Sequence, residues 1–171
     1  MSLRKDEGRC AVVSIDAFED GDLAAITRFV EAIQEHERLG VPELRAGSEI
    51  GPSYVELLIR TAAERTGHIL MAREESRAIG FVCAWVEMDD DPLLRDDARV
   101  YAYVSDIFVE PDWRRHGVAG RLLNAIEDRM YAQGCRRMRI CSKAANRLAV
   151  GFYEQAGYRP HEIVFAKMIN R

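Results

Sequence analysis

The chain has 171 residues, of which 48% are hydrophobic and 30% are charged. This composition is typical of a globular domain and excludes a disordered, collagenous or coiled-coil chain. We expect one domain over residues 1–171, with a flexible tail at residues 1–9. No apolar run approaches the roughly 18 residues that a membrane span needs. The charged N-terminus also lacks the apolar core of a signal peptide, so we expect a cytoplasmic protein that binds no membrane.

The net charge of −4 is unevenly distributed along the chain. Residues 1–111 carry 12 basic and 23 acidic side chains, whereas residues 112–171 carry 12 basic and 5 acidic ones. One interpretation is a chance distribution of surface charge. The other is an anionic ligand at the C-terminal part and a cationic one at the N-terminal part. Nucleic acid is not expected, because the chain is acidic overall and its basic residues are not interleaved with stacking aromatic residues.

Cysteines and histidines give no sign of a metal site or a disulfide framework. The four cysteines contain no Cys-x-x-Cys pair and lie in or beside apolar stretches, which favours buried free thiols in a reducing compartment. Two isolated histidines have no partner at ligand spacing, so no metal is expected. These residues are Cys10, Cys83, Cys135, Cys141, His36 and His68.

The first half of the chain predicts one strand, two helices and a hairpin, in that order. The apolar run at 10–18 predicts a strand, and a three-to-four spacing of apolar residues predicts a helix from Asp20 or Asp22 to about residue 39. A polar loop follows, and Ser53 is expected to cap a second helix that begins at Tyr54 and ends near residue 66. Residues 68–73 and 78–86 then predict a hairpin.

The second half predicts strands that alternate with helices. An acidic loop is expected at 87–97, followed by a strand at 99–109, a helix at 118–133, a strand at 136–141, a helix at 146–155 and a closing strand at 158–169. The full order is β-α-α-β-β-β-α-β-α-β. Hairpins in the middle and crossovers near the end predict a mixed α/β (α+β) fold, with helices on both faces of the sheet.

The residues between the strand at 99–109 and the helix at 118–133 predict an anion site. Three small residues, Gly117, Ala119 and Gly120, leave the backbone accessible where a helix begins. The N–H groups of a first helical turn have no partner within the helix, and the helix dipole places partial positive charge there. Arg114, Arg115, His116 and Arg121 add further positive charge. The predicted ligand is a phosphate or pyrophosphate group, although a strand–turn–helix junction that uses glycines only for packing remains open.

Two motifs resemble those of the GNAT family of N-acetyltransferases. Arg114-x-x-Gly117-x-Ala119, with Asp-Ile-Phe-Val-x-Pro before it and Arg-Leu-Leu after it, resembles the family's Arg/Gln-x-x-Gly-x-Gly/Ala signature. Asn146-x-x-Ala149-x-x-x-Tyr153-x-x-x-Gly157-Tyr158 resembles a second family element. Together they cover residues 100–160, whereas the first hundred residues match only in the order of their elements.

The resemblance implies a fold, a co-substrate and the residues that bind it. The fold is a mostly antiparallel central sheet that splays apart after its fourth strand, with acetyl-coenzyme A in the opening. The backbone of Ile107, Phe108 and Val109 would pair with the pantetheine arm, and Asn146 would contact the same region. The backbone amides that would hold the pyrophosphate are those of Arg115, His116, Gly117, Val118, Ala119 and Gly120.

The resemblance also implies that an amine attacks the thioester directly. Tyr153 matches the family's proton donor to the leaving thiolate. A backbone amide near Val109 would stabilise the developing oxyanion. Several related enzymes carry Glu-Asp where this chain has Ser105-Asp106, so only the aspartate is retained. We expect Asp106 to be the base or an anchor for the acceptor. Two alternatives stay open: a structural carboxylate that accepts hydrogen bonds from the backbone or from arginine, and a water chain that ends on Tyr103, Ser105 or the acidic loop. Strand alternation predicts that Tyr101, Tyr103 and Ser105 share one face and that Asp106 lies on the other.

The sequence leaves the acceptor and the reaction open. An N-acetyltransferase acting on an amine of a small molecule or peptide is one interpretation, and the acidic residues at 87–97 would then attract a cationic amine. A non-catalytic sensor of acyl-coenzyme A with the same fold is the alternative, favoured by the missing glutamate at position 105. Transfer of a longer acyl group and formation of a homodimer, which is common in the family, are also open.

Overall fold

The structure is a computed structural model that describes residues 12–169. The chain divides into two compact units, of which the first ends at Cys141 and the second begins at Ser142. Each unit is described by itself. The single domain over residues 1–171 stays a prediction. The predicted tail at 1–9, Cys10 and the first two residues of the predicted strand at 10–18 lie outside the described residues.

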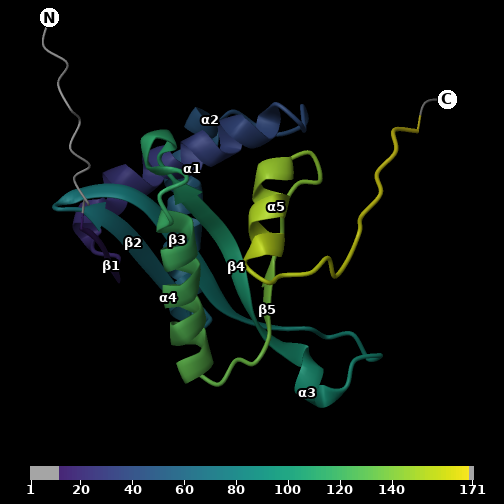
Figure 1. Cartoon of the computed structure of the whole chain (residues 1–171). Helices are drawn as coiled ribbons and strands as arrows, with labels where there is room; N and C mark the ends of the chain where they lie inside the picture. Colours follow the sequence, from purple (N-terminus) through teal and green to yellow (C-terminus); the bar gives the residue numbers. More distant parts are fainter. Residues whose placement is uncertain (1–11, 170–171) are drawn as a thin grey trace, which may run out of the picture. The chain divides into compact units, whose positions relative to one another are not determined.

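A five-stranded sheet forms the centre of the first unit (Figure 1). The strands lie in the order β1-β2-β3-β4-β5, so that sequence neighbours are also neighbours in space. The first three pairings are antiparallel, and only β4 and β5 run parallel. This mixed sheet confirms the predicted fold class. The strands are β1 (Val13–Ala17), β2 (His68–Glu74), β3 (Arg77–Met88), β4 (Val100–Val109) and β5 (Met138–Ile140).

The sheet opens between its last two strands. β5 pairs with β4 at Ala102, Tyr103 and Val104. Among residues 12–169, no strand pairs with the remaining half of β4, Ser105–Val109, on this side. A strand edge without a partner presents unpaired N–H and C=O groups. The predicted splay after the fourth strand is therefore present.

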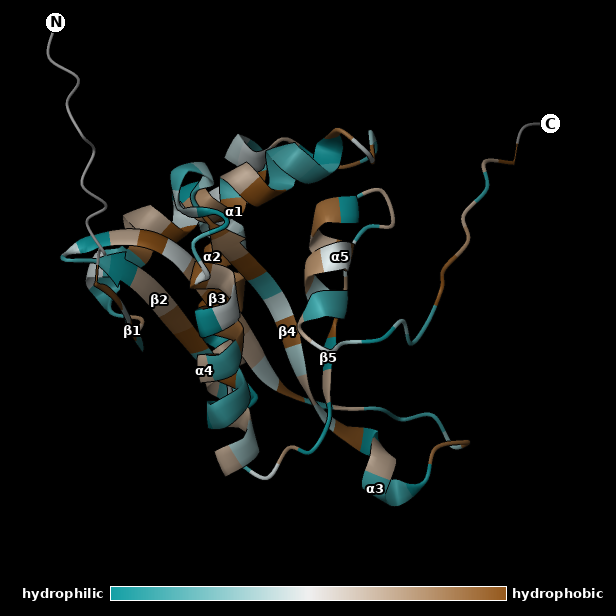
Figure 2. Ribbon diagram, viewed as in Figure 1, coloured by the Kyte–Doolittle hydropathy of each residue, from teal (hydrophilic) through white to brown (hydrophobic). Residues whose placement is uncertain are grey.

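Helices cover both faces of the sheet. One face packs against α1 (Leu23–Arg38) and α2 (Gly47–Glu64), and a core of side chains such as Phe29, Leu58 and Phe81 fills the space between them. α4 (Val118–Ala132) packs on the other face with Leu122, Leu123, Ile126 and Met130 buried. Figure 2 shows long hydrophobic stretches along β2 and β3, as expected for strands buried on both faces.

Three short elements complete the first unit: the 3-10 turns η1 (Asp20–Asp22) and η2 (Pro111–Trp113) and the single-turn helix α3 (Asp96–Arg99). The described part of the second unit contains one regular element, the helix α5 (Arg147–Gln155). The predicted acidic loop at 87–97 is therefore interrupted at both ends, because β3 continues to Met88 and α3 begins at Asp96.

The second helix begins seven residues before its predicted start at Tyr54. α2 begins at Gly47, and its interior contains Pro52, which the sequence pattern treats as part of a loop. A neighbouring helix sets this start. Glu35 of α1 accepts a 2.6 Å hydrogen bond from the Gly47 amide, which satisfies a donor at the helix terminus. A Cβ atom at Gly47 would lie 2.5 Å from the Glu31 carbonyl oxygen, so only glycine allows this approach.

The predicted closing strand at 158–169 does not form. No strand is present among residues 142–169, and α5 is the only regular element there. β-propensity gives a segment extended geometry, but a strand is defined by hydrogen bonds to a partner. Pro160 also removes one of the donors that a ladder would use.

The cysteines follow the expectation only in part. Cys83 and Cys135 are buried free thiols, as predicted, but Cys141 is exposed because it lies just beyond the end of the three-residue β5. Within residues 12–169, no group of three His, Cys, Asp or Glu side chains could hold a metal ion. In the same range, no helix is both long and apolar enough to cross a bilayer.

Candidate active site

A β-bulge in β4 determines where the acidic side chain of this strand points. Cys83 of β3 pairs with Asp106, but the next residue, Ala84, pairs with Val104, so Ser105 is the extra residue. An extra residue reverses the alternation of side chains beyond it. Tyr103 and Asp106 therefore lie on the same face, toward α1 and α2. The prediction that they lie on opposite faces was wrong, because regular alternation was assumed.

Asp106 lies beneath the helical layer and remains partly open to solvent. Its Oδ2 atom accepts a hydrogen bond of 3.1 Å from the hydroxyl of Tyr54 on α2. Burial raises the pKa of the Asp106 carboxyl above its ordinary value, and the negative charge of Glu37 adds to this effect. Hydrogen bonds from Ser105 and Tyr54 favour the charged form and act in the opposite direction.

The titratable groups around Asp106 are also perturbed. Burial raises the pKa of the Cys83 thiol to about 12, and Asp106 contributes to this shift. Burial also raises the pKa values of the Tyr54 and Tyr103 hydroxyls above their ordinary range, and the charge of Asp106 contributes to both shifts. Tyr54, Cys83 and Tyr103 are therefore neutral at physiological pH. Asp106 is thus surrounded by neutral groups and one other carboxylate.

This arrangement can accept a proton. A carboxyl group whose pKa is raised toward the working pH is a better base than an ordinary aspartate. Its partial exposure leaves room for a ligand to approach. A carboxyl whose pKa is raised by burial and that is still reachable from solvent indicates a functional site.

The open edge of β4 lies directly after Asp106. It includes Ile107, Phe108 and Val109, the residues expected to pair with an extended ligand. Phe108 is buried and stacks on Phe29 of α1 with ring centroids 5.0 Å apart. Val109 is buried as well. These contacts hold the strand in place, so that the backbone groups of its open edge need no reorganisation. The Val109 carbonyl already has a partner, because it accepts a hydrogen bond from Arg114 Nε.

The segment after β4 leads into the start of α4. Arg115 and Gly117 both adopt left-handed backbone conformations, with φ of 67° and 77°. Gly117 is the N-cap of α4, and no side chain caps the helix. The first hydrogen bond of the helix joins the Arg121 amide to the Gly117 carbonyl. The amides of Val118, Ala119 and Gly120 consequently point outward from the helix start. Added Cβ atoms at Gly117 and Gly120 would meet nothing within 4 Å, so the surface is open beside these two residues.

The basic side chains near this loop are mostly directed at backbone carbonyls. Arg114 Nε donates a 3.0 Å hydrogen bond to the Val109 carbonyl, and Arg121 donates to the Val13 carbonyl. His116 Nδ1 lies 2.8 Å from the Arg114 carbonyl oxygen. Arg115 is exposed. Arg114 and His116 thus shape the loop, and its free amides are the groups best placed for an anion.

Asn146 and Tyr153 belong to the second unit. The Asn146 side-chain oxygen accepts a 3.2 Å hydrogen bond from the Ala149 amide and caps α5. Tyr153 is partly buried, and its ring meets the edge of Tyr158 with centroids 6.1 Å apart. The motif residues of this unit therefore form a capped helix whose tyrosine packs against aromatic neighbours. Their roles toward a ligand stay predictions.

Part of the acidic segment at 87–97 is already paired with arginine. Asp89 Oδ2 accepts a 2.9 Å hydrogen bond from Arg139 of β5, and the Arg139 guanidinium lies 4.1 Å from the centre of the Tyr101 ring. Asp97 lies 3.7 Å from Arg137, also near β5. Asp89 and Asp97 are thus partly neutralised, so the attraction of this segment for a cation is weaker than its composition suggests.

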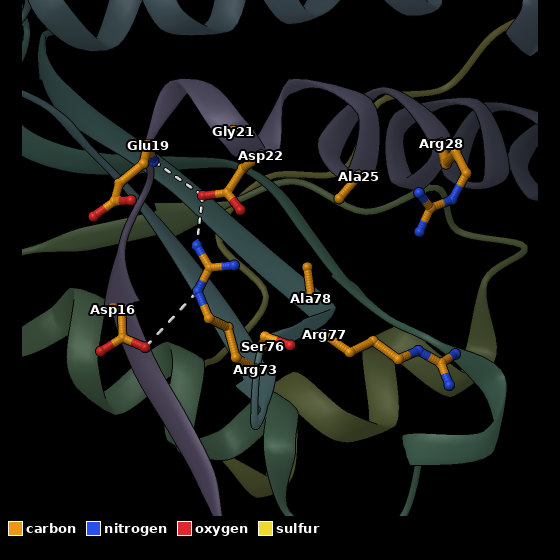
Figure 3. A pocket seen from close by; sticks show the side chains of 10 residues that line it. All are labelled: Asp16, Glu19, Gly21, Asp22, Ala25, Arg28, Arg73, Ser76, Arg77 and Ala78. Carbon is orange, nitrogen blue, oxygen red and sulfur yellow. Dashed lines mark hydrogen bonds and ion pairs between the residues drawn. The ribbon is translucent and has the colours of Figure 1, made fainter.

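A separate pocket of about 670 Å³ lies beside β1, η1 and the β2–β3 turn (Figure 3). None of the predicted site residues lines it. Its central Arg73 is paired with Asp22 at 2.6 Å and with Asp16 at 3.9 Å. Burial raises the pKa of Asp22, but the hydrogen bonds from Arg73 and the Glu19 amide outweigh this effect and lower it overall. These charges satisfy one another, which indicates a structural ion-pair network.

Tyr54 is the site residue that the sequence analysis missed. The periodicity of α2 places Val55 and Leu58 in the core, and both are buried. Tyr54 precedes them at the predicted start of the helix, where its contact with a residue 52 positions away is not encoded in any local pattern. One feature of the sequence could have indicated Tyr54: it is an aromatic residue with a hydroxyl group, and it lies next to the aliphatic residues that α2 buries.

Comparisons with known proteins agree with this geometry. A model described as "Acetyltransferase (GNAT) family" matches residues 30–158. The solved structure of the aminoglycoside N-acetyltransferase AAC(6')-Iy in complex with CoA superposes with a TM-score of 0.70 at 19% identity, covering 95% of this chain and 98% of that chain. The same enzyme in complex with the bisubstrate analogue CoA-S-monomethyl-acetylneamine gives 0.67 at 18% identity, covering 93% and 99%.

A third solved structure extends the likeness beyond aminoglycoside enzymes. A putative acetyl transferase from Pyrococcus furiosus superposes with a TM-score of 0.70 at 21% identity, covering 92% of this chain and all of that chain (100%). At these identities the superpositions establish the fold. The family model covers most of the chain, including β4, the segment that leads from β4 into α4, and α4 itself. This chain therefore belongs to the GNAT family of acetyltransferases.

Proposed function

We propose that the protein transfers an acetyl group from acetyl-coenzyme A to a primary amine of a small molecule or peptide. The reaction is a direct attack within a ternary complex. The observation that carries this proposal is the unpaired half of β4, which leads without interruption into a loop with outward-pointing amides. A ligand that combines an extended amide-containing arm with a pyrophosphate matches both features.

The residues present fit coenzyme A. The pantetheine arm contains amides that can pair with the backbone of Ile107–Val109 as an added strand would. The pyrophosphate suits the amides of Val118, Ala119 and Gly120, where the helix dipole favours negative charge. Structural neighbours solved with CoA or a CoA analogue support the same choice.

The proposed chemistry is one acyl transfer accompanied by proton transfers at the attacking nitrogen and at the leaving sulfur. The amine enters as an ammonium ion and loses a proton to Asp106. Its nitrogen then forms a bond to the thioester carbonyl carbon, and a backbone amide near Val109 stabilises the oxyanion. The carbon–sulfur bond breaks, and the Tyr153 hydroxyl donates a proton to the departing thiolate. The nitrogen gives up its second proton, which passes through solvent to the Tyr153 phenolate, and Asp106 releases the first proton to solvent. The products are an acetamide and free coenzyme A.

The acceptor is proposed to be cationic. Asp106 and Glu37 place two carboxyl groups near the attack position, and ammonium groups are attracted to such a site. Neighbours of this fold include aminoglycoside acetyltransferases, whose substrates carry several amines. The cytoplasm remains the proposed location.

The first experiment is thiol release from acetyl-coenzyme A across a panel of aminoglycosides, polyamines and peptides, with Tyr153→Phe measured beside the wild type. We expect release with one amine class and a loss of at least tenfold in kcat for the variant. Absence of release with every amine, together with tight binding of acetyl-coenzyme A, would favour the non-catalytic sensor. Faster release from a longer thioester would identify a different acyl donor.

The co-substrate site has its own test in Gly120→Ala. Alanine favours helix over glycine by up to about 1 kcal/mol, and its Cβ would enter open space, so we expect a higher Tm. The same methyl group would lie at the helix start where the pyrophosphate is proposed to bind, so we expect coenzyme A to bind several-fold more weakly, measured by calorimetry. Because the variant is more stable, weaker binding could not be attributed to unfolding. Unchanged affinity would place the pyrophosphate elsewhere.

A further inference from the structure

The side chain that contacts Asp106 from the helical layer is Tyr54. The Tyr54 hydroxyl donates to Asp106 Oδ2 at 3.1 Å, and the two residues are separated by 52 positions in the chain. The Tyr54 ring packs against the core cluster between the sheet and the helices. This hydrogen bond therefore joins α2 to β4 immediately after the bulge at Ser105.

The position of Tyr54 is fixed by a close contact between two helices. α2 lies against α1 at Gly47 and Gly51, where any Cβ atom would overlap with Glu31. Glu35 also holds the Gly47 amide at 2.6 Å. Tyr54 follows Gly51 by less than one turn, so the α1–α2 contact determines where its hydroxyl lies.

The groups that face Asp106 make this hydroxyl important. They are Glu37 from α1, Tyr54 from α2, Cys83 from β3, and Ser105 and Tyr103 from its own strand. All of them are neutral or anionic. Burial and Glu37 disfavour the carboxylate, whereas donors such as the Tyr54 hydroxyl favour it. Tyr54 remains a donor up to high pH because its own pKa is raised by burial and by Asp106.

We propose that Tyr54 is a positioning residue for acetyl transfer, whose hydroxyl fixes the orientation of the Asp106 carboxylate and keeps it available as the proton acceptor. This inference rests on the proposed function, in which Asp106 receives the proton of the amine. If so, α2 helps to set the pH range of the reaction, although it lies outside both sequence motifs.

The test is the pH profile of Tyr54→Phe, which removes one oxygen atom and keeps the ring. Loss of a hydrogen bond to a carboxylate raises its pKa, so the acidic limb of kcat/KM should move upward by about one pH unit. At a pH below that limb the rate should fall by about tenfold, and at high pH it should approach the wild-type rate. Coenzyme A affinity should remain within twofold. The matched control is Tyr131→Phe, an exposed tyrosine near the end of α4, which should leave the profile unchanged.

A second measurement does not depend on activity. Titration of the Asp106 carboxyl carbon by NMR, in wild type and Tyr54→Phe, should show a higher midpoint in the variant. Site-specific 3-fluorotyrosine at position 54 donates a stronger hydrogen bond and should move the midpoint downward, which keeps the test available if the phenylalanine variant does not fold.

The outcomes separate the two proposals. Equal Asp106 midpoints in all three proteins would overturn the role of Tyr54, and so would lower activity with an unshifted pH profile. Absence of thiol release from the wild type would contradict the proposed function, while the NMR titration would still report on the Tyr54–Asp106 pair.

Discussion

Asp106 illustrates how a single half-buried carboxyl can reduce stability and support chemistry. Its pKa is raised in the fold, chiefly by burial, above the ordinary value of 3.8. The folded state therefore binds this proton more tightly than the unfolded state does. The resulting contribution to stability is fully present below about pH 3.8, and it is lost as the pH rises through the folded-state pKa. Near neutral pH, the ionised group is a cost to the fold.

The neutral variant Asp106→Asn should therefore be more stable than the wild type at pH 8 and inactive in acetyl transfer. A gain of about 1 kcal/mol would appear as a rise of roughly 2–4 °C in Tm. The difference should narrow as the pH is lowered, because the wild-type carboxyl becomes protonated. Thermal unfolding from pH 4 to pH 8 measures this, and a variant that is less stable at pH 8 would contradict the pKa direction.

At the scale of the element, α1 and α2 can pack closely because α2 has glycines, which carry no side chain, where it meets α1. Gly47 and Gly51 bring α2 against Glu31, and Glu35 caps the first turn of α2. The hydrogen bond from the Gly47 amide, with a smaller contribution from Arg38, lowers the pKa of Glu35. Because this contact also places Tyr54 above Asp106, helix packing and the candidate site are linked.

Replacing Gly47 with alanine should separate the two helices. The new Cβ would lie 2.5 Å from a backbone oxygen that cannot rotate away, so we expect a loss of about 1–3 kcal/mol in the free energy of unfolding. Gly21→Ala is the matched control, since its Cβ would meet nothing within 4 Å. Urea unfolding of both variants measures the difference. Equal stability of the two would show that α2 can shift without cost.

At the scale of the whole molecule, the sequence predicted what depends on local patterns. Hydrophobic periodicity located α1, β2, β3 and α4 to within a few residues, whereas the anion site at 114–120 stays a prediction. Three features depended on distant partners and were missed: the early start of α2, the contact of Tyr54 with Asp106 and the bulge at Ser105. The segment at 158–169 shows the converse, because β-propensity without a partner strand gave no strand.

The bulge at Ser105 has a further consequence for how this strand tolerates changes in length. Asp106 keeps its pairing with Cys83, and Val104 keeps its pairing with Ala84, although Ser105 stands between them as an extra residue. Deleting the codon for Ser105 would remove the bulge and leave Asp106 on the side of α1 and α2, because it would then directly follow Val104 in a regular strand. The bulge thus absorbs one residue without exchanging the two faces of the sheet. Substitution scanning keeps the residue count constant and never samples this kind of change.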